Sequence, residues 1–491
     1  MESDEVQLQP KDLEKIRMAV LLHVPIEITT YTLPRKMELY IHRLMEEFFK
    51  ECHQEHMTES LKFCLGELLT NSKKANTKRV YFQEKNLDIN NEMQYNDGMF
   101  SFKNDTLVNI NHYLHLQKDQ GYYIKLSLKV DDDNVTIEIR NNAVLTKGER
   151  RRILEKMNTA KHYDTVQDAI GRIIDQTEGA GLGIIIIILM LQKLGISNDN
   201  FTITTTDTET VTKMNIPVNP EYLKGLYFLC DEYVLTQDQI PVLSENYEKM
   251  CALVKDVEPD VERIKELLSQ DVTLLLLLLK KASEMGSKPR TITKALEVVG
   301  IENLRSVYNH ANPFVNIITD KEKESIWSHA YKTAYCAYNI VQNFYPDQLD
   351  SEEVFVAALF HDIGNLFLKT TQPEVFEHLK KRLKEKEYPE QSFSQFEGAG
   401  KHNYSGKYIL EKFGVNDTIC KVAEYHNQPE VVPEEERKIV YSVYLADIIQ
   451  YYKTGIIEFY QIDKKVLDEL GIYSEEELKY IVKQLETVIS L

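Results

Sequence analysis

Two hydrophobic patterns divide the chain near residue 218. Before this point Leu61, Leu65 and Leu68 recur at helical spacing, whereas the segments YYIKLSLKV, VTIEIR and FTITTT alternate or carry β-branched residues as strands do. Polar, turn-rich stretches between them, such as NNEMQYNDG, indicate loops or hairpin ends. The first part of the chain is therefore predicted to be an α+β domain.

After IPVLSENY the strand pattern gives way to successive amphipathic helical segments that continue to the C-terminus. In NIPVNPEY, Pro217 and Pro220 each disfavour helix at the residue before them, so we place the main boundary there. A second predicted boundary, near Ala311, divides the helical part of the chain. The predicted segments are an N-terminal extension at 1–34, an α+β domain at 35–218, a leading helical sub-bundle at 225–312, a helical domain at 313–455 and a C-terminal helical extension at 456–491.

Length and charge limit the classes of function. The 491 residues exceed the roughly 250–300 at which a single core stops growing, so at least two domains are expected. The formal net charge of -19 repels nucleic-acid backbones and argues against a role on genomic nucleic acid. Six cysteines without CxxC spacing indicate reduced thiols in a cytoplasmic protein. The apolar run from Ile184 to Leu191 is far shorter than the roughly 18–20 residues of a membrane span, so none is expected.

The segment VFVAALFHDIGNLFL contains an adjacent histidine and aspartate. Helical spacing brings His361 onto the apolar side of a helix that starts near Glu353, and Gly364 then gives the backbone freedom to turn. Burying the ionised Asp362 costs several kcal/mol unless a cation or strong hydrogen bonds compensate. The pair therefore predicts a buried partner.

Candidate partners lie on separate helical segments. His329 shares one side of its helix with Cys336 and Ile340, which directs it towards the core. Asp447 lies in an apolar stripe with Tyr444, and a buried aspartate in such a stripe is uncommon. Both residues are therefore expected to face inward.

Two further histidines, His402 in GAGKHNYSG and His426 in EYHNQP, lie near predicted helix ends. Taken singly, each histidine of the chain is more simply explained as an ordinary core or surface side chain with a hydrogen-bond partner. Together, the imidazoles and carboxylates suit Fe, Mn, Zn or a similar divalent cation. Two such ions bridged by a carboxylate can activate water against a phosphoester.

The order of His329, His361-Asp362-Ile-Gly and Asp447 resembles the H…HD…D motif of the HD superfamily of metal-dependent phosphohydrolases. The segments ELLSQDVTLLLLLLKKAS, ITKALEVVGIENLRSV, GAGKHNYSG and EYHNQP are similar to an HDOD domain over about residues 235–455. This resemblance implies an all-α helical bundle with a divalent metal centre that is binuclear in the related HD-GYP phosphodiesterases of cyclic di-GMP. The implied ligands are His329, His361, Asp362 as the bridging residue, Asp447, and, for a second metal, His402 and His426.

The chain departs from the HD-GYP pattern at three points. Asn365 stands where those enzymes usually carry lysine, the GYP loop is absent, and Tyr425-His426 replaces the paired histidines often seen there. The resemblance therefore leaves two outputs open. One is hydrolysis of a phosphoester, with His361 and Asp362 as catalytic residues; the other is non-catalytic signalling or scaffolding through a protein partner.

In the N-terminal part, LKFCLGELLTNSKKA places Glu67 and Asn71 on one helical face, where the carboxylate can polarise water and the amide oxygen can ligate Mg²⁺. In EGAGLGIIIIILMLQKLG, Gly179, Gly181 and Gly183 let backbone amides approach a phosphate chain at the start of a helix. Each motif alone is more simply explained by packing.

In this order, the two motifs resemble the N-box and glycine-rich lid box of the GHKL ATPase fold, over about residues 35–218. The resemblance implies an α/β sandwich that binds ATP or ADP with Mg²⁺. The family's adenine-reading aspartate is replaced by Asn141 or Asn142, and Ala143 replaces a glycine, which favours binding over turnover.

We therefore expect a cytoplasmic, bacterial-type signal-transduction protein that joins a GHKL-like nucleotide-binding sensor module to a metal-binding HDOD domain. Its expected ligand is a nucleotide or cyclic dinucleotide, with a signalling protein as an alternative partner; the sequence leaves the oligomeric state open. The rival hypotheses are a non-catalytic HDOD scaffold and an anti-sigma-type protein kinase acting through the N-terminal domain.

Overall fold

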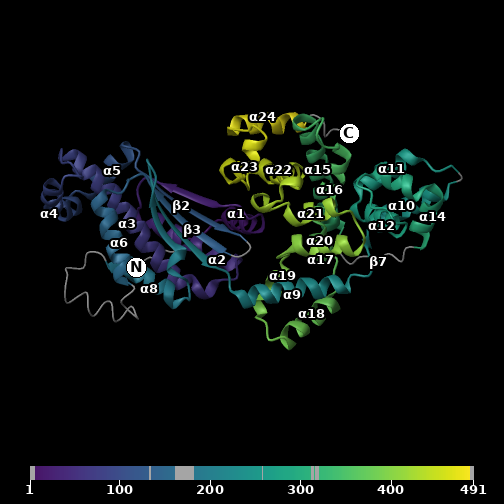
Figure 1. The fold of residues 1–491 in the computed structure, drawn as a ribbon, viewed down its shortest axis with the longest axis horizontal. Coiled ribbons are helices and arrows are strands. Elements are labelled where there is room, and N and C mark those ends of the chain that lie inside the picture. Colours follow the sequence, from purple (N-terminus) through teal and green to yellow (C-terminus); the bar gives the residue numbers. More distant parts are fainter. Residues whose placement is uncertain are drawn as a thin grey trace. The chain divides into compact units, whose positions relative to one another are not determined.

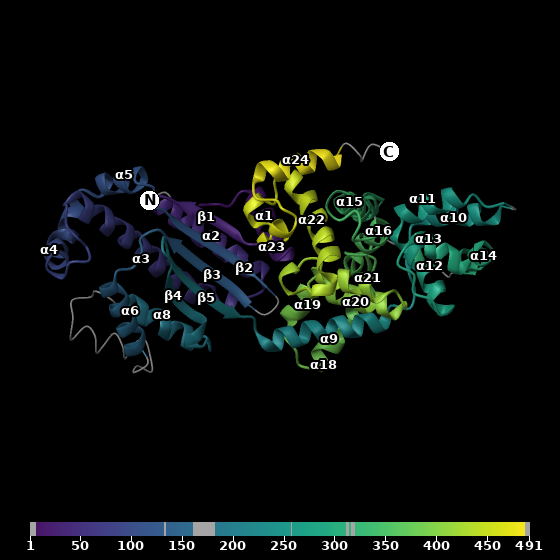
Figure 2. The ribbon, with the colours of Figure 1, turned by 45° about the horizontal axis from the view of Figure 1, so that its top comes forward.

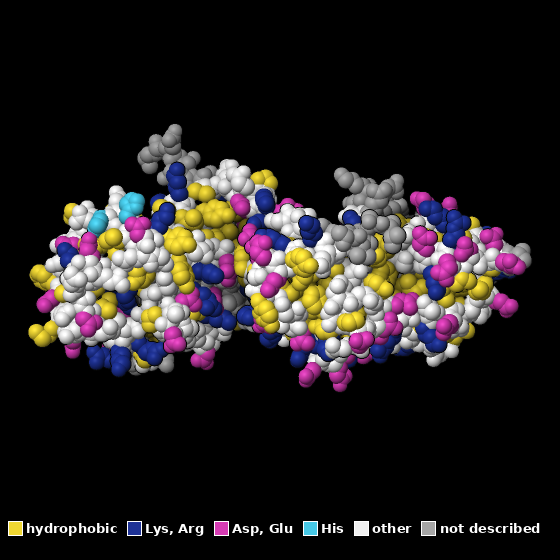
Figure 3. Space-filling model, turned by 90° about the horizontal axis from the view of Figure 1, so that it is seen from above, with side chains coloured by type: hydrophobic (Ala, Val, Ile, Leu, Met, Phe, Trp, Pro, Cys, Tyr) yellow, Lys and Arg dark blue, Asp and Glu magenta, His cyan; other side chains and the backbone are white. Residues whose placement is uncertain are grey.

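The computed structural model describes residues 6–131, 134–160, 182–256, 258–310, 314–315 and 320–486. The chain divides into two compact units, Met1–Val218 and Asn219–Leu491 (Figure 1). No helix in these described ranges is both long enough and apolar enough to cross a membrane. On the face drawn in Figure 3, acidic and basic side chains are interspersed over the surface.

The first unit is built on a five-stranded antiparallel sheet with the strand order β1-β2-β3-β5-β4. Its strands are β1 (Ile26–Thr30), β2 (Ile124–Val130), β3 (Asn134–Asn141), β4 (Phe201–Thr205) and β5 (Thr210–Pro217). Buried and half-buried positions alternate along β2 and β3, as expected for strands with one face on a core. The three predicted strand segments are confirmed as β2, β3 and β4, and β1 adds an edge strand from within the segment 1–34.

The helices of this unit lie beside the sheet (Figure 2). They are α1 (Pro10–Leu21), α2 (Arg35–Glu51), α3 (Thr58–Glu84), α4 (Glu92–Val108), α5 (Ile110–Asp119), α6 (Lys147–Ala160) and α8 (Leu182–Lys193). The long helix α3 packs on β2 and β3, and Leu61, Leu65 and Leu68 are buried along it as their spacing predicts. The α+β class of this unit is thus confirmed.

The prediction of a loop over NNEMQYNDG was wrong, because this stretch contains the start of α4. The Asn91 side chain accepts hydrogen bonds from two backbone amides of the first turn and so caps the helix. Tyr95 and Phe102 then pack against the buried cluster around Tyr81 and Phe82. A polar composition gave no indication of this tertiary packing.

The second unit is helical, as predicted, apart from two-residue strands β6 (Pro241–Val242) and β7 (Phe314–Val315) that pair in parallel. Its helices are α9 (Pro220–Thr236), α10 (Ser244–Lys255), α11 (Val261–Gln270), α12 (Val272–Glu284), α13 (Ile292–Val299), α14 (Ile301–His310), α15 (Asp320–Phe344), α16 (Ser351–Leu359), α17 (Ile363–Lys369), α18 (Pro373–Glu385), α19 (Glu390–Glu397), α20 (His402–Lys412), α21 (Asp417–Tyr425), α22 (Arg437–Lys453), α23 (Lys464–Glu469) and α24 (Glu475–Glu486).

The central helices of this unit form the frame for the candidate site. α15 packs on α16 and α22, α17 packs on α20, and α21 packs on α16 and α20. Their contacts bring together segments that lie far apart in the sequence, from His329 to Asp447.

Candidate metal centre

His361 and Asp362 lie in the short connection between α16 and α17. α16 is buried along most of its length and ends at Leu359, so the histidine follows the helix instead of belonging to it. Gly364 lies inside α17, and a Cβ there would collide with the backbone of His402 in α20. The glycine therefore permits close approach of two helices, which corrects the expectation that it allows a turn.

Six residues meet at this connection, and we call them the His/Asp cluster. They come from α15, the connection after α16, the start of α20, the end of α21, and α22: His329, His361, Asp362, His402, His426 and Asp447. Four of them, His361, His402, His426 and Asp447, are at most 5% exposed. The structure therefore brings together every histidine and carboxylate for which the sequence predicted a metal site.

The cluster contains two groups that share Asp362. His329, His361 and Asp362 form one group, and Asp362, His402 and His426 form the other; within each, the ligand atoms lie within 4.8 Å of one another. In the second group, Asp362 Oδ1 lies 3.1 Å from His402 Nε2 and 3.8 Å from His426 Nε2. A single carboxylate thus stands between two sets of imidazoles.

Asp447 closes the first group from α22. Its Oδ1 atom lies 3.1 Å from His329 Nε2 and 3.8 Å from His361 Nε2. Tyr451, one helical turn further along α22, places its ring 5.8 Å from that of His329. The two acidic residues therefore contact the histidines from separate elements.

Three of the histidines are oriented in the same way. The Nδ1 atoms of His361, His402 and His426 each donate to the backbone carbonyl of the alanine three residues earlier, at 2.7, 3.0 and 2.9 Å. This bond fixes the ring and leaves Nε2 to face the cluster, the arrangement usual for a metal-binding histidine.

Several donor atoms of the His/Asp cluster lack a partner that a cation could supply. Within the described residues, the buried atoms His361 Nε2, His329 Nε2 and Asp447 Oδ1 have no hydrogen-bond partner of acceptable geometry. A buried polar atom without a partner costs about 1–3 kcal/mol. Mixed imidazole and carboxylate donors suit Fe, Mn or Zn, so these residues fit a divalent cation that would satisfy them.

The histidines and carboxylates of the cluster shift one another's pKa values. Burial raises the pKa of Asp362, but the hydrogen bond from His402 and the charges of the neighbouring histidines outweigh it and hold the pKa well below its usual value. Burial lowers the pKa of His329 and His402, yet their carboxylate partners raise it overall. Burial and the positive charge of nearby histidines lower the pKa of His426 to about 3. The group around Asp362 therefore includes a neutral imidazole, the form that ligates metal.

Two asparagines beside the cluster hold its parts in place. Asn365 Nδ2 donates to Asp362 Oδ1 at 3.0 Å, so the residue that departs from the HD-GYP pattern contacts the shared carboxylate. Asn403 Nδ2 donates at 3.0 Å to the backbone carbonyl of Glu424, which joins the segments that carry His402 and His426. The role of Asn403 could not be predicted from sequence spacing, because its partner is a backbone atom on another helix.

In the first unit, the structure brings Glu67 and Asn71 of α3 against Gly183 in the first turn of α8. A Cβ at Gly183 would collide with the Glu67 carboxylate and lie 3.9 Å from Asn71 Nδ2. The absence of a side chain at Gly183 therefore allows α8 to start beside both polar groups. Gly179 and Gly181 lie outside the described residues.

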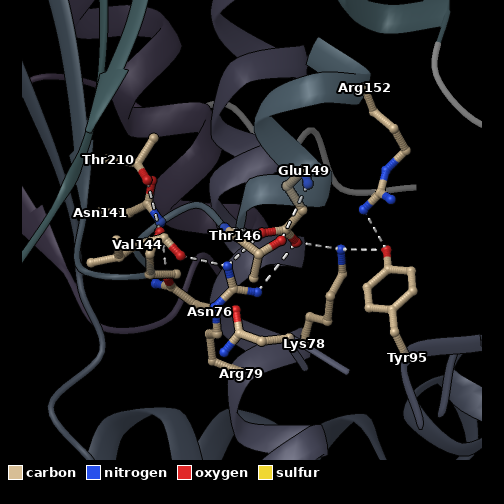
Figure 4. A network of polar contacts seen from close by, with 12 residues as sticks. Asn76, Lys78, Arg79, Tyr95, Asn141, Val144, Thr146, Glu149, Arg152 and Thr210 are labelled. Carbon is tan, nitrogen blue, oxygen red and sulfur yellow. Dashed lines mark hydrogen bonds and ion pairs between the residues drawn. The ribbon is translucent and has the colours of Figure 1, made fainter. Parts of the chain in front are cut away.

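The two asparagines at the end of β3 point in different directions. Asn141 is buried, and its Nδ2 donates to Asn76 Oδ1 of α3 at 3.1 Å (Figure 4). The Asn142 side chain instead bonds backbone atoms of Gly121 and Tyr123 near the start of β2. Of the two candidates for the adenine-reading position, only Asn141 faces the helix that carries Glu67.

A buried ion-pair network that the sequence did not indicate lies beside Asn141 (Figure 4). Glu149 of α6 accepts from Arg79 at 2.6 Å and from Lys78 at 2.9 Å, both on α3. Burial raises the pKa of Glu149, but these two cations outweigh it and lower the pKa to about 2. The network links α6 to α3 close to Thr210, whose hydroxyl donates to the backbone after β3.

Comparison with known proteins gave a family match in the second unit. Residues 240–429 match the family described as the HDOD domain. An uncharacterized protein of Treponema pallidum (strain Nichols) is 32% identical over 481 residues, which cover 97% of this chain and 94% of that protein.

Two solved structures resemble the chain weakly. A fragment of the MmoQ response regulator of Methylococcus capsulatus has 17% identity and a TM-score of 0.37, covering 49% of this chain and 94% of its own. An HDOD domain protein of unknown function from Geobacter sulfurreducens has 21% identity and a TM-score of 0.29, covering 54% and 95%.

Proposed function

Because the chain belongs to the same family as the Treponema pallidum protein and residues 240–429 form an HDOD domain, we propose that it is a cytoplasmic signalling protein whose His/Asp cluster binds divalent metal. The proposal rests on Asp362, which is common to both groups of candidate ligands. Fe or Mn suits the mixture of imidazole and carboxylate donors. We infer a binuclear site, in which Asp362 would contact both ions and Asp447 would complete the first.

We propose hydrolysis of a phosphoester, in a nucleotide or cyclic dinucleotide, as the output of this site. When bound, two divalent ions bridged by a carboxylate supply an activated water molecule and neutralise charge on the phosphate. The chain's own residues orient the metal-binding atoms. Hydrogen bonds to backbone carbonyls keep the histidine Nε2 atoms directed inward, and the hydrogen bond from Asn365 orients the carboxylate of Asp362. The alternative output is a conformational signal to a protein partner, which the asparagine in place of lysine and the missing GYP loop favour.

Elemental mass spectrometry of protein prepared anaerobically with Mn²⁺ or Fe²⁺ tests the metal site. We expect wild type to retain metal at both groups, Asp362→Asn to lose both ions, and His402→Gln to lose only the ion of the second group, because only Asp362 is shared. Asp347→Asn, at an exposed position outside the cluster, is the matched control and should retain wild-type metal content. Metal-free wild type after this preparation would contradict the proposal.

The same samples separate the two outputs. A panel of cyclic dinucleotides and nucleotides, incubated with metal-loaded wild type, should yield phosphoester cleavage that Asp362→Asn abolishes. Loaded protein that leaves every substrate intact would remove the enzymatic output and favour the signalling scaffold.

For the first unit we propose binding of ATP or ADP with Mg²⁺, supported by the position of Gly183 beside Glu67 and Asn71. Calorimetry of wild type and Asn71→Ala tests it, with Asn96→Ala, on the exposed side of α4, as the control. Binding that Asn71→Ala removes and Asn96→Ala keeps is the expected result. Equal, undetectable binding in all three proteins would remove both the nucleotide-sensor proposal and the anti-sigma-type kinase alternative.

A further inference from the structure

A cavity of about 370 Å³ opens in the second unit between α11, α13, α15 and α16. None of the residues that line it belongs to the His/Asp cluster. Its volume lies within the range of small-molecule sites, roughly 300–1,000 Å³. It is therefore a second place in this unit where a ligand could be held.

One wall of the cavity is a row of tyrosine rings on α15. Tyr331, Tyr335 and Tyr338 follow one another at i, i+4 and i+7, so they share one face of the helix. The ring centroids of the first pair lie 6.2 Å apart and those of the second pair 6.3 Å apart, with interplanar angles of 28° and 17°. Phe355 of α16 meets the Tyr331 ring edge-on and closes the row. The three tyrosine rings are only half-buried, so aromatic surface remains available inside the cavity.

Acidic side chains form another part of the cavity lining. α11 buries an apolar face and directs Glu262 and Glu266 towards the cavity, while Glu352 lines it from the first turn of α16. Lys265 is the one basic residue among those that line it, and its ammonium lies 3.8 Å from Glu262 at the outer edge. Three carboxylates against one ammonium leave the cavity with a net negative charge.

We propose that this cavity binds a small organic cation that carries a quaternary ammonium, primary ammonium or guanidinium group. Aromatic ring faces attract such a charge, and they do so most strongly where water is partly excluded. The carboxylates add attraction and would repel anionic ligands. Burial raises the pKa of the Tyr331 hydroxyl, and Tyr335 and the Glu266 carboxylate raise it further; of these groups, the Glu266 carboxylate adds negative potential at the tyrosine row.

A bound inorganic cation fits this cavity less well than an organic one. The acidic residues come from two helices, and Glu352 Oε1 already accepts hydrogen bonds from the Thr293 amide and hydroxyl at 2.8 and 3.0 Å. Aromatic side chains, which form most of the remaining wall, offer no oxygen ligand for a hard cation on their faces. The ligand class is therefore set by the combination of ring faces and carboxylates. This site is separate from the proposed metal centre and does not depend on it.

Isothermal titration of the full chain at constant ionic strength tests the proposal with choline, spermidine and arginine as probes. Dimethylbutanol, the neutral carbon isostere of choline, is the matched control ligand. We expect at least one of the three cations to bind and dimethylbutanol to bind at least about tenfold more weakly, because it lacks the charge that the rings and carboxylates recognise.

Substitutions test the contributions of the aromatic and the acidic residues separately. Tyr335→Leu should weaken binding about tenfold or more, Tyr335→Phe should retain it because the ring face remains, and Glu266→Gln should weaken it severalfold. Tyr473→Leu and Glu302→Gln, at exposed positions away from the cavity, should bind as wild type. Thermal unfolding followed by circular dichroism verifies that each variant is folded. No binding of any cation, equal binding of choline and its isostere, or unchanged binding in folded Tyr335→Leu would overturn the proposal.

Discussion

Two carboxylates, the buried Glu149 and the half-buried Asp362, are surrounded by cationic groups of different kinds. Glu149 is paired with Arg79 and Lys78, whose charges persist at all physiological pH values. Asp362 is surrounded by imidazoles, whose charge depends on pH and whose protons are released when a metal binds. The first arrangement suits a permanent structural contact, and the second suits a site that exchanges protons for a cation.

Glu149 gives a pH prediction for the first unit. Its pKa is lowered from 4.5 to about 2, so it stabilises the fold fully above pH 4.5 and loses that contribution as the pH falls towards 2. Glu149→Gln should lower the free energy of unfolding at neutral pH by about 3 kcal/mol, because Arg79 and Lys78 then lack a counter-charge. Thermal unfolding of this variant as a function of pH should also lose the acid-dependent component. Glu155→Gln, on the exposed side of α6, is the control and should keep wild-type stability. Wild-type stability of Glu149→Gln at neutral pH would refute the stabilising role of the Glu149 ion pairs.

At the scale of elements, the contact between α17 and α20 sets the distance between Asp362 and His402 in the His/Asp cluster. Gly364 allows the backbone of α17 to approach that of α20 at His402 and Gly406. Asp362 immediately precedes α17, and His402 begins α20, so this contact sets which imidazoles reach the shared carboxylate.

Gly364→Ala should therefore destabilise the second unit by about 1–3 kcal/mol, the usual cost of overpacking, and weaken metal retention at the second group. Gly66→Ala is the matched control in a helix interior, because its added methyl would meet only His42, at an ordinary 3.6 Å. Chemical denaturation gives the stability and elemental mass spectrometry the metal content. Unchanged values for both quantities in Gly364→Ala would show that the helices have room for a side chain.

The sequence predicted elements better than it predicted contacts between them. Alternation identified β2 and β3, and inward-facing positions identified His329 and Asp447, because both depend on local periodicity. The loop predicted at NNEMQYNDG failed because α4 is held by packing on residues more than ten positions away in sequence. The Glu149 network and the hydrogen bond from Asn403 to a carbonyl join residues on different helices, and the spacing of residues along the sequence does not predict that these lie close together. The positions of Gly179 and Gly181 stay predictions.

At the scale of the whole molecule, the chain carries two units with separate cores, one on a sheet and one on a helical bundle. Differential scanning calorimetry should show two unfolding transitions, because each unit buries its own apolar surface. Glu149→Gln should lower the midpoint of one transition and Gly364→Ala that of the other. A single transition that both substitutions shift equally would show that the units unfold together.

α15 belongs to two sites at once. It presents His329 to the His/Asp cluster and, two residues later, Tyr331 to the aromatic cavity, while α16 joins the cavity residue Phe355 to His361. If the helix adopts a slightly different position when either site is filled, thermodynamic reciprocity requires each ligand to change the affinity of the other by the same factor. The protein would then work as a coincidence detector, in which the supply of metal sets the concentration of organic cation that is sensed.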